Sequence, residues 1–214
     1  PYSIKWDGDA NPLLINDPRF APAGVLAPKS KADLAFTMHI LSWLAVNGTA
    51  AIVEFPGVLY RGGAERKIRK YLIDNNYVDT VIQLPPDLFF GTTIATCIIV
   101  LKKSKTDNSV LFIDASAEVK RGGNKNKLTE ANQQHVLDTF TARESVDHVA
   151  ALVSNEDIAA NDYNIAVSSF VEQEDTREVI DITELNAEIA RIVARQQELR
   201  TSIDEIVADL EGTK

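Results

Sequence analysis

The strongest constraint on the fold comes from two apolar runs that only nine residues separate. They are YVDTVIQL (77–84) and IATCIIVLKK (94–103), both of strand length and rich in β-branched residues. The linker PPDLFFGTT is too short for a helical crossover, so we expect the two strands to pair antiparallel. A later run, VLFIDAS (110–116), is expected to add an edge strand.

Helices alternate with strands before this pair. Apolar residues at helical spacing over 34–44 lead to Asn47 and Gly48, a C-cap signal. TAAIVEF (49–55) has the character of a buried strand, and we expect this strand to present an unpaired edge. AERKIRKYLIDNN (64–76) has the pattern of an amphipathic helix. This order predicts an α/β fold, the C-terminal half of a doubly wound, Rossmann-like sheet with an antiparallel final strand.

The chain is expected to have three parts. Residues 1–116 form the α/β domain, and the proline-rich segment 3–28 within it is expected to be a long loop. Residues 117–179 form a mixed extension, with a helix over 128–144 and an irregular segment over 145–171. Residues 180–214 form a long, coiled-coil-like C-terminal helix.

Charge and cysteine content limit the partners and the compartment. The net charge of −9 argues against a free-standing nucleic-acid binder, although RGGAERKIRK (61–70) carries five basic residues and one acid. The single cysteine, Cys97, suits a reducing cytoplasm. The longest apolar run, IATCIIVL (94–101), is too short to span a bilayer, so we expect a cytoplasmic protein without membrane contact.

Several common chemistries lack support in the sequence. No G-x-G-x-x-G or Walker loop occurs, and the histidines His39, His135 and His148 stand singly, as packing or surface histidines do. Cys97 lies inside an apolar strand and is expected to be a core residue. We therefore expect neither a metal site nor a catalytic triad.

Aromatic residues offer a more specific signal. Tyr2 follows Pro1 at the start of the chain, and Phe89 and Phe90 lie in the turn between the two antiparallel strands. A hydrophobic plug in a turn is the common structural alternative. If both segments meet at one edge of a doubly wound sheet, they are placed to clamp a flat ring between aromatic faces.

Four segments carry a resemblance to a known family. They are PYS, KSKADLAFTMHIL, GVLYRGGAERKIRKYLI and LPPDLFFGTTIATCIIVLKK. In this order the chain resembles the modification subunit of type I restriction–modification enzymes, which are S-adenosylmethionine-dependent adenine-N6 DNA methyltransferases. The resemblance is dense over 1–116, weaker through NDYNIAVSSFV and only architectural at the C-terminal helix. It implies that residues 1–116 are the C-terminal part of the methyltransferase domain.

The resemblance also implies roles for the aromatic residues. The family's catalytic loop reads Asn-Pro-Pro followed by Tyr or Phe, so Pro1 and Tyr2 correspond to its second proline and its aromatic. Tyr2 would stack on the adenine after the base is flipped out of the duplex. Phe90, with Phe89 as the competing choice, would pack against the same base. The Asn, the first Pro and the glycine-rich cofactor loop would precede residue 1, so we expect this chain alone to bind S-adenosylmethionine poorly and to be inactive.

The basic segment after the first strand is a candidate contact for DNA. Gly62 and Gly63 open a helix after a parallel strand, an arrangement that presents backbone N–H groups to anions. We expect these glycines to hold target-strand phosphate together with Arg61, Lys67 and Arg69. The alternative is a solvated helix face, which is favoured for Arg66 and Lys70.

The C-terminal helix carries a heptad seam interrupted by one polar residue, Gln196. We expect the seam to dock on the long helices of the specificity subunit, which reads the sequence in such systems, or to pair with a second methyltransferase copy; the restriction subunit is a further expected partner. The alternative for this helix is that it folds back on its own domain. For the function of the whole chain, the alternatives are a related amino-methyltransferase acting on RNA or protein glutamine, and a non-catalytic assembly module. The seam consists of Leu185, Ile189, Ile192, Leu199, Ile203, Ile206 and Leu210.

Overall fold

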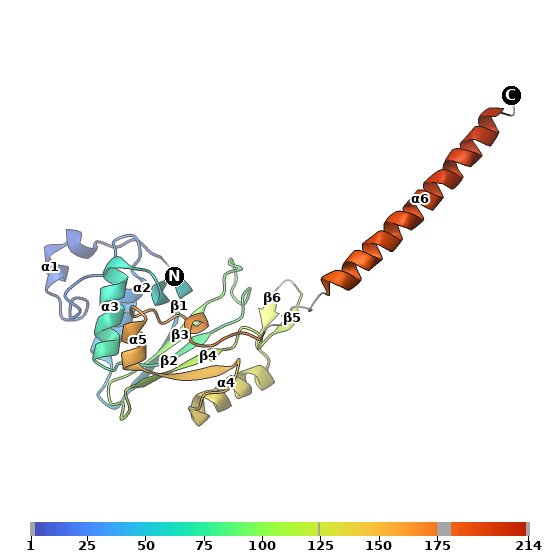
Figure 1. Ribbon diagram of the computed structural model, residues 1–214. Helices are drawn as coiled ribbons and strands as arrows, with labels where there is room; N and C mark the ends of the chain where they lie inside the picture. Colours follow the sequence, from blue (N-terminus) through green and yellow to red (C-terminus); the bar gives the residue numbers. More distant parts are fainter. Residues whose placement is uncertain (1–2, 124, 175–180, 213–214) are drawn as a thin grey trace. The chain divides into compact units, whose positions relative to one another are not determined.

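The computed structural model describes residues 3–123, 125–174 and 181–212 (Figure 1). The chain divides into two compact units at residues 174 and 175. The first unit contains a five-stranded sheet with helices, and the second contains one long helix. The segment after residue 116, predicted as an extension, therefore belongs up to residue 174 to the same unit as the sheet.

The sheet of the first unit has the strand order β1-β3-β2-β4-β7. The pairing of β2 with β3 is antiparallel, which confirms the prediction from the nine-residue linker. β1 and β7 are also antiparallel to their neighbours, whereas β2 and β4 are parallel. The bounds are β1 Thr49–Glu54, β2 Val78–Gln83, β3 Cys97–Lys102, β4 Ser109–Asp114 and β7 Ala150–Ser154.

Two strands differ from the prediction. β4 is not an edge strand, because β7 from the segment predicted to be irregular pairs with it. β1 lies at the edge, as expected, but it is not fully buried: Ala50 and Ile52 pack against the core while Ala51 and Val53 are exposed. An edge strand that is covered on one face shows this alternation.

Two hydrophobic clusters lie on opposite faces of the sheet. Helices α2, α3 and α5 cover one face, and α4 covers the other (Figure 1). Phe112 of β4 packs on the first face against Phe170, with ring centroids 4.4 Å apart. The four helices are α2 Asp33–Trp43, α3 Gly63–Asp74, α4 Glu130–Ala142 and α5 Asn155–Ala160.

The helix ends and the short elements differ in places from the prediction. α2 ends at Trp43, before the predicted cap at Asn47 and Gly48, because Leu44 already adopts an extended conformation. The predicted long loop near the start contains η1 (Gly8–Ala10) and α1 (Pro12–Ile15). The remaining short elements are η2 (Pro56–Leu59), β5 (Lys120–Gly122), β6 (Lys125–Lys127) and η3 (Val167–Ser169).

The second unit is helix α6 (Ile182–Gly212), which confirms the predicted long helix. None of its described residues is buried. Among the helices that the structure describes, none has the length and apolar character needed to cross a membrane.

Candidate active site

Three strands of the sheet end at the same edge. β1 and β2 both run antiparallel to β3, so they are parallel to each other, and β4 is parallel to β2. The last residues of β1 and β2, Glu54 and Gln83, both lie opposite Cys97. Ligands of doubly wound α/β folds bind outside the carboxyl ends of the strands. The loops that leave this edge follow β1, β2 and β4 and are the expected location of a ligand site.

The start of the described chain is anchored at this edge. The backbone N–H of Ser3 donates to Oδ1 of Asp33 at 2.6 Å, and its hydroxyl lies 3.4 Å from Oδ2. Asp33 begins α2, and one turn later Thr37 donates to Oε1 of Glu54 at 2.9 Å. Because Glu54 ends β1, Ser3 lies at the carboxyl edge. Pro1 and Tyr2, the predicted catalytic residues, precede Ser3 in sequence but lie outside the described residues.

Glu54 is a buried acid that the sequence analysis did not single out. Its side chain is 2% exposed, and burial raises its pKa to about 7 against the opposing hydrogen bond from Thr37. The nearby carboxylate of Asp33 raises the pKa further. Glu54 therefore changes charge near neutral pH beside the residue that anchors Ser3. The available signal was an acid at the end of an apolar strand, AIVE.

The turn between β2 and β3 carries the two predicted stacking residues. Phe90 is fully exposed and Phe89 is 38% exposed. Gly91 has a φ of +80°, which lets the chain reverse direction directly after them. Because this turn leaves the carboxyl end of β2, the structure places Phe90 and Ser3 at the same edge of the sheet.

Arg61 is held in its own loop by three contacts. Its guanidinium lies 5.3 Å from the ring centroid of Phe55 and 3.4 Å from Oε1 of Glu65. A Cβ at Gly57 would come within 2.2 Å of Nη2 of Arg61, so this packing requires a glycine. Arg61 thus has a fixed position near the start of α3.

Arg69 cannot contact phosphate, so its predicted role in DNA binding is wrong. It is 1% exposed, and its guanidinium donates to the carbonyl oxygens of Tyr163 and Val58 at 2.7 and 2.9 Å. Burial lowers its pKa to about 10, which leaves it charged at neutral pH. Arg69 therefore joins α3 to the loop after β1 and to the segment after α5.

Of the other residues in this segment, two basic side chains are paired with acids, whereas one lysine and the two glycines are exposed. Arg66 is paired with Asp162, and Lys70 contacts Asp74 and the hydroxyl of Tyr163. Lys67, Gly62 and Gly63 are exposed near the first turn of α3. Of the predicted DNA contacts, Lys67 and the two glycines are exposed at this edge, whereas Arg61 is partly buried and paired with Glu65.

Metal and thiol chemistry find no site in the described residues. No group of three or more His, Cys, Asp or Glu side chains among them is placed to hold a metal ion. Cys97 is buried, and burial raises its pKa to about 12, so its thiol stays protonated. His39 packs between Phe20 and Trp43, with ring centroids 5.4 and 4.6 Å away.

Comparisons with known proteins identify the family of the chain. The family model described as N-6 DNA Methylase matches residues 1–179. A type I restriction enzyme methylase subunit, MpnII, of Mycoplasma pneumoniae is 46% identical over 98% of this chain, and the MjaVII methylase subunit of Methanocaldococcus jannaschii is 31% identical over 88%. The chain spans only 39% and 33% of these two relatives.

A solved structure supports the same assignment. The type I restriction-modification system methyltransferase subunit from Streptococcus thermophilus superposes with a TM-score of 0.78 at 47% identity. The match covers 80% of this chain and 36% of that subunit. Sequence and fold therefore agree over most of the chain, which belongs to the N-6 DNA methylase family.

Proposed function

We propose that this chain is the C-terminal part of a type I methylase subunit that methylates adenine N6 in double-stranded DNA. One observation carries the proposal: Ser3 and the turn with the exposed Phe90 lie at the same edge of the sheet. Ser3 directly follows Pro1 and Tyr2 in the sequence. We infer that the sheet is the C-terminal half of a doubly wound methyltransferase sheet. The proposed cytoplasmic location follows from the DNA substrate.

The chemistry explains why aromatic residues are needed at this edge. The adenine amino group is a poor nucleophile, because its lone pair is delocalised into the ring. In the family's catalytic loop, the Asn side-chain oxygen and the first Pro carbonyl accept hydrogen bonds from the two N–H groups of the adenine amino group. Tyr2 would stack on the flipped base, and Phe90 would contact it from the β2–β3 turn. Asp33 would support this arrangement by holding Ser3.

S-adenosylmethionine is the methyl donor in this proposal, and we infer that the described residues form only part of its site. The glycine pair that opens a helix after β1, Gly62 and Gly63, has basic neighbours and open space around it. The described part of that loop has no acid placed to accept ribose hydroxyls, since Glu65 is buried and paired with Arg61. We therefore expect the chain alone to transfer no methyl group and the donor to require the rest of a complete subunit.

Replacing Tyr2 tests the catalytic assignment in a complete methylase subunit that carries this chain. Tyr2→Ala should lower the rate of methyl transfer to adenine, since a stacked base contributes about 1–3 kcal/mol. Tyr2→Phe should retain activity because it keeps the ring. Trp43→Ala is the matched control, since Trp43 is an exposed aromatic at the far end of α2. Normal methylation by Tyr2→Ala would falsify the assignment, and transfer to RNA or protein instead of DNA would favour the related amino-methyltransferases.

A second function, subunit assembly, is favoured by the exposed seam of α6. Every seam residue, from Leu185 to Leu210, is exposed in the structure, and apolar heptad seams are buried against other helices in coiled coils. We propose that α6 docks on helices of a specificity subunit, or pairs with a second methylase copy in its absence. The restriction subunit would join the same assembly.

Matched double variants test the assembly role. Ile192→Asp with Leu199→Asp places two charges in the seam and should abolish co-purification with the specificity subunit. Ala194→Asp with Thr201→Asp places the same charges at the same spacing on the opposite face of the helix and should leave assembly intact. Equal behaviour of the two double variants would contradict the docking of the seam.

A further inference from the structure

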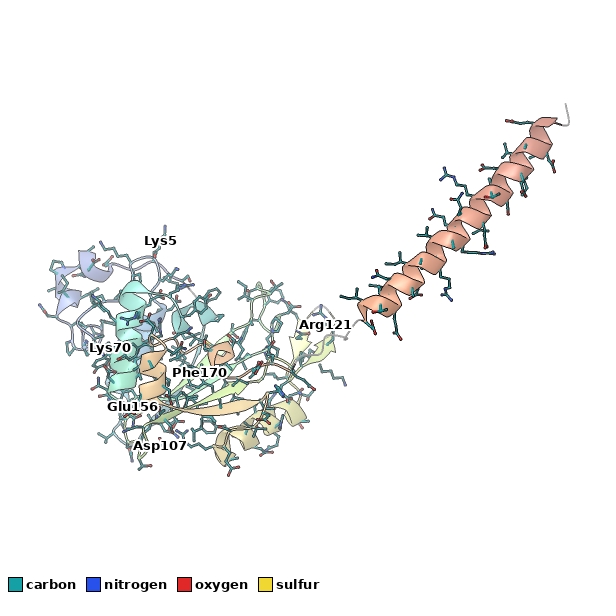
Figure 2. The ribbon with its side chains drawn as sticks, in the orientation of Figure 1. Lys5, Lys70, Asp107, Arg121, Glu156 and Phe170 are labelled. Atoms are coloured by element: carbon teal, nitrogen blue, oxygen red, sulfur yellow. The ribbon has the colours of Figure 1, made fainter. Side chains whose placement is uncertain are left out.

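A small basic hairpin lies at the same edge as the candidate site. β5 and β6 pair antiparallel, with Lys120 opposite Lys127 and Gly122 opposite Lys125. The segment 119–127, VKRGGNKNK, contains four basic residues and no acid. It follows the carboxyl end of β4, and Figure 1 shows β5 and β6 at the end of the sheet where β4 finishes. Figure 2 labels Arg121 at this end.

The hairpin holds the turn that carries Phe90. Asp87 in this turn accepts hydrogen bonds from Arg121 at 2.8 Å and from Lys125 at 2.7 Å. Lys125 also donates to the carbonyl of Thr92 at 3.0 Å. Asn126 donates from its side chain to the carbonyl of Pro86 and from its backbone to that of Asp87. The hairpin therefore contacts the turn on both sides of Phe89 and Phe90.

Two of the four cations have no acidic partner in the part of the chain that the structure describes. Arg121 and Lys125 are paired with Asp87, whereas the exposed Lys120 and Lys127 are not paired with any described acid. The stem of Lys127 packs over Gly122, where an added Cβ would lie 3.1 Å from its Cδ. Lys120 and Lys127 are cross-strand neighbours, so like charges stand together on one short ribbon. Such an arrangement is unfavourable unless an anion lies between or beside them.

We propose that the β5–β6 hairpin binds the phosphate backbone of DNA next to the displaced base. Lys120 and Lys127 contact phosphates, while Arg121 and Lys125 fix the hairpin to the Phe90 turn. The net charge of the chain is −9, so attraction to DNA requires a local cluster of free cations such as this one. The proposal rests on the proposed function for its ligand, but it is tested by binding rather than by chemistry.

The salt dependence of DNA binding tests the phosphate contacts. Binding of a short fluorescent duplex is measured by anisotropy between about 50 and 200 mM salt, with the 214-residue chain and with a complete subunit that carries it. Lys120→Ala with Lys127→Ala should weaken binding about tenfold and lower the magnitude of the log–log salt slope by about 2. The control is Lys103→Ala, because Lys103 directly follows β3 at the opposite edge of the sheet.

Asp87→Asn separates position from charge. This change makes the chain less acidic, so a general electrostatic attraction would strengthen DNA binding. If the hairpin must be held on the turn, the variant should instead weaken binding and speed amide hydrogen exchange in 86–93 and 120–127. Tighter binding by Asp87→Asn would contradict the positioning role of the hairpin.

The remaining outcomes separate this inference from the proposed function. In a complete subunit the double lysine variant should raise KM for DNA and leave kcat unchanged, whereas Tyr2→Ala acts on kcat. Unchanged affinity and slope in the double variant, an equal loss in Lys103→Ala, or tighter binding to an RNA duplex of the same sequence would each overturn the inference. Failure of the wild type to methylate adenine would overturn the proposed function while the binding measurement still decides the role of the hairpin.

Discussion

Two basic stretches, 61–70 and 120–127, follow the carboxyl ends of β1 and β4 but use their charges differently. In the first, Arg69 is buried, Arg61 is paired with Glu65, and Arg66 with Asp162. In the second, one acid, Asp87, holds two cations, and Lys120 and Lys127 remain exposed. The stretch with more basic residues thus offers fewer free charges.

The difference shows that basic residues close in sequence do not by themselves form a basic surface. A cation at the inner face of a helix meets backbone carbonyls and buried acids, and its charge is then used by the fold. A cation on a two-stranded ribbon at the end of a sheet has solvent on most sides. The location of the residue in the fold therefore decides whether a phosphate can reach it.

The largest expected effect concerns Arg69, whose charge has a structural role in the first stretch. Arg69→Met keeps much of the side-chain volume but leaves two buried carbonyl oxygens without donors, so it should lower the free energy of unfolding by about 4 kcal/mol. Lys67→Met in the same helix is exposed and should change it by less than about 0.5 kcal/mol. Urea unfolding measures both, and equal values would remove the contrast between buried and free cations.

A second expectation uses pH, because the pKa values of Glu54, at the end of β1, and of Asp87, at the hairpin, are shifted in opposite directions. Burial raises the pKa of Glu54 from 4.5 to about 7, so the folded state keeps a proton that the unfolded state releases. The contribution of Glu54 to the free energy of unfolding is thus fully present below about pH 4.5. It falls by about 3 kcal/mol in all as the pH rises to about 7. The hydrogen bond from Lys125 lowers the pKa of Asp87, whose contribution is instead lost in acid, below the ordinary aspartate pKa of 3.8.

Glu54→Gln should remove the first of these two pH dependences. The amide oxygen can still accept from Thr37, so the variant should gain stability relative to wild type at about pH 8 and little at about pH 5. Thermal unfolding across this range checks the prediction. If the wild type and Glu54→Gln show the same pH dependence over this range, Glu54 is ionised in the folded state throughout.

The smallest expected effect is that of Gly57→Ala. The added methyl group displaces the guanidinium of Arg61 without changing any charge, and because the displaced atoms end a flexible side chain, the stability should change by less than about 1 kcal/mol. If Arg61 contacts phosphate from its observed position, this variant should weaken DNA binding as much as Arg61→Ala does. Unchanged binding in both would leave the hairpin as the main phosphate contact of the two stretches.

The parts of the fold that local patterns specify could be predicted from the sequence. The helices over 33–43, 63–74 and 130–142 and the antiparallel β2–β3 pair follow from apolar periodicity and linker length. β7 could not be found this way, because its five residues form a strand by pairing with β4, which lies far away in sequence. The position of β4 inside the sheet depends on the same distant contact.

The candidate site shows the same limit. The sequence motif identifies Phe90, and the structure places it, exposed, at the carboxyl edge. The burial of Arg69 cannot be predicted from the sequence, because one of its acceptors, the carbonyl of Tyr163, lies 94 residues away. The hairpin has no apolar periodicity in VKRGGNKNK that would predict it, although the four basic residues around a Gly-Gly pair are a usable signal.

The exposure of α6 has a thermodynamic consequence. A helix without buried side chains gains no stability from tertiary packing, and isolated helices are only marginally stable in water. If the seam docks on a partner, the 31 residues of α6 would gain helical order in the same step that buries their apolar side chains. Association would then show a large negative heat-capacity change and a favourable enthalpy offset by lost conformational entropy, the signature of folding coupled to binding. Calorimetry of assembly would thus report on the folding of this helix as well as on its contacts.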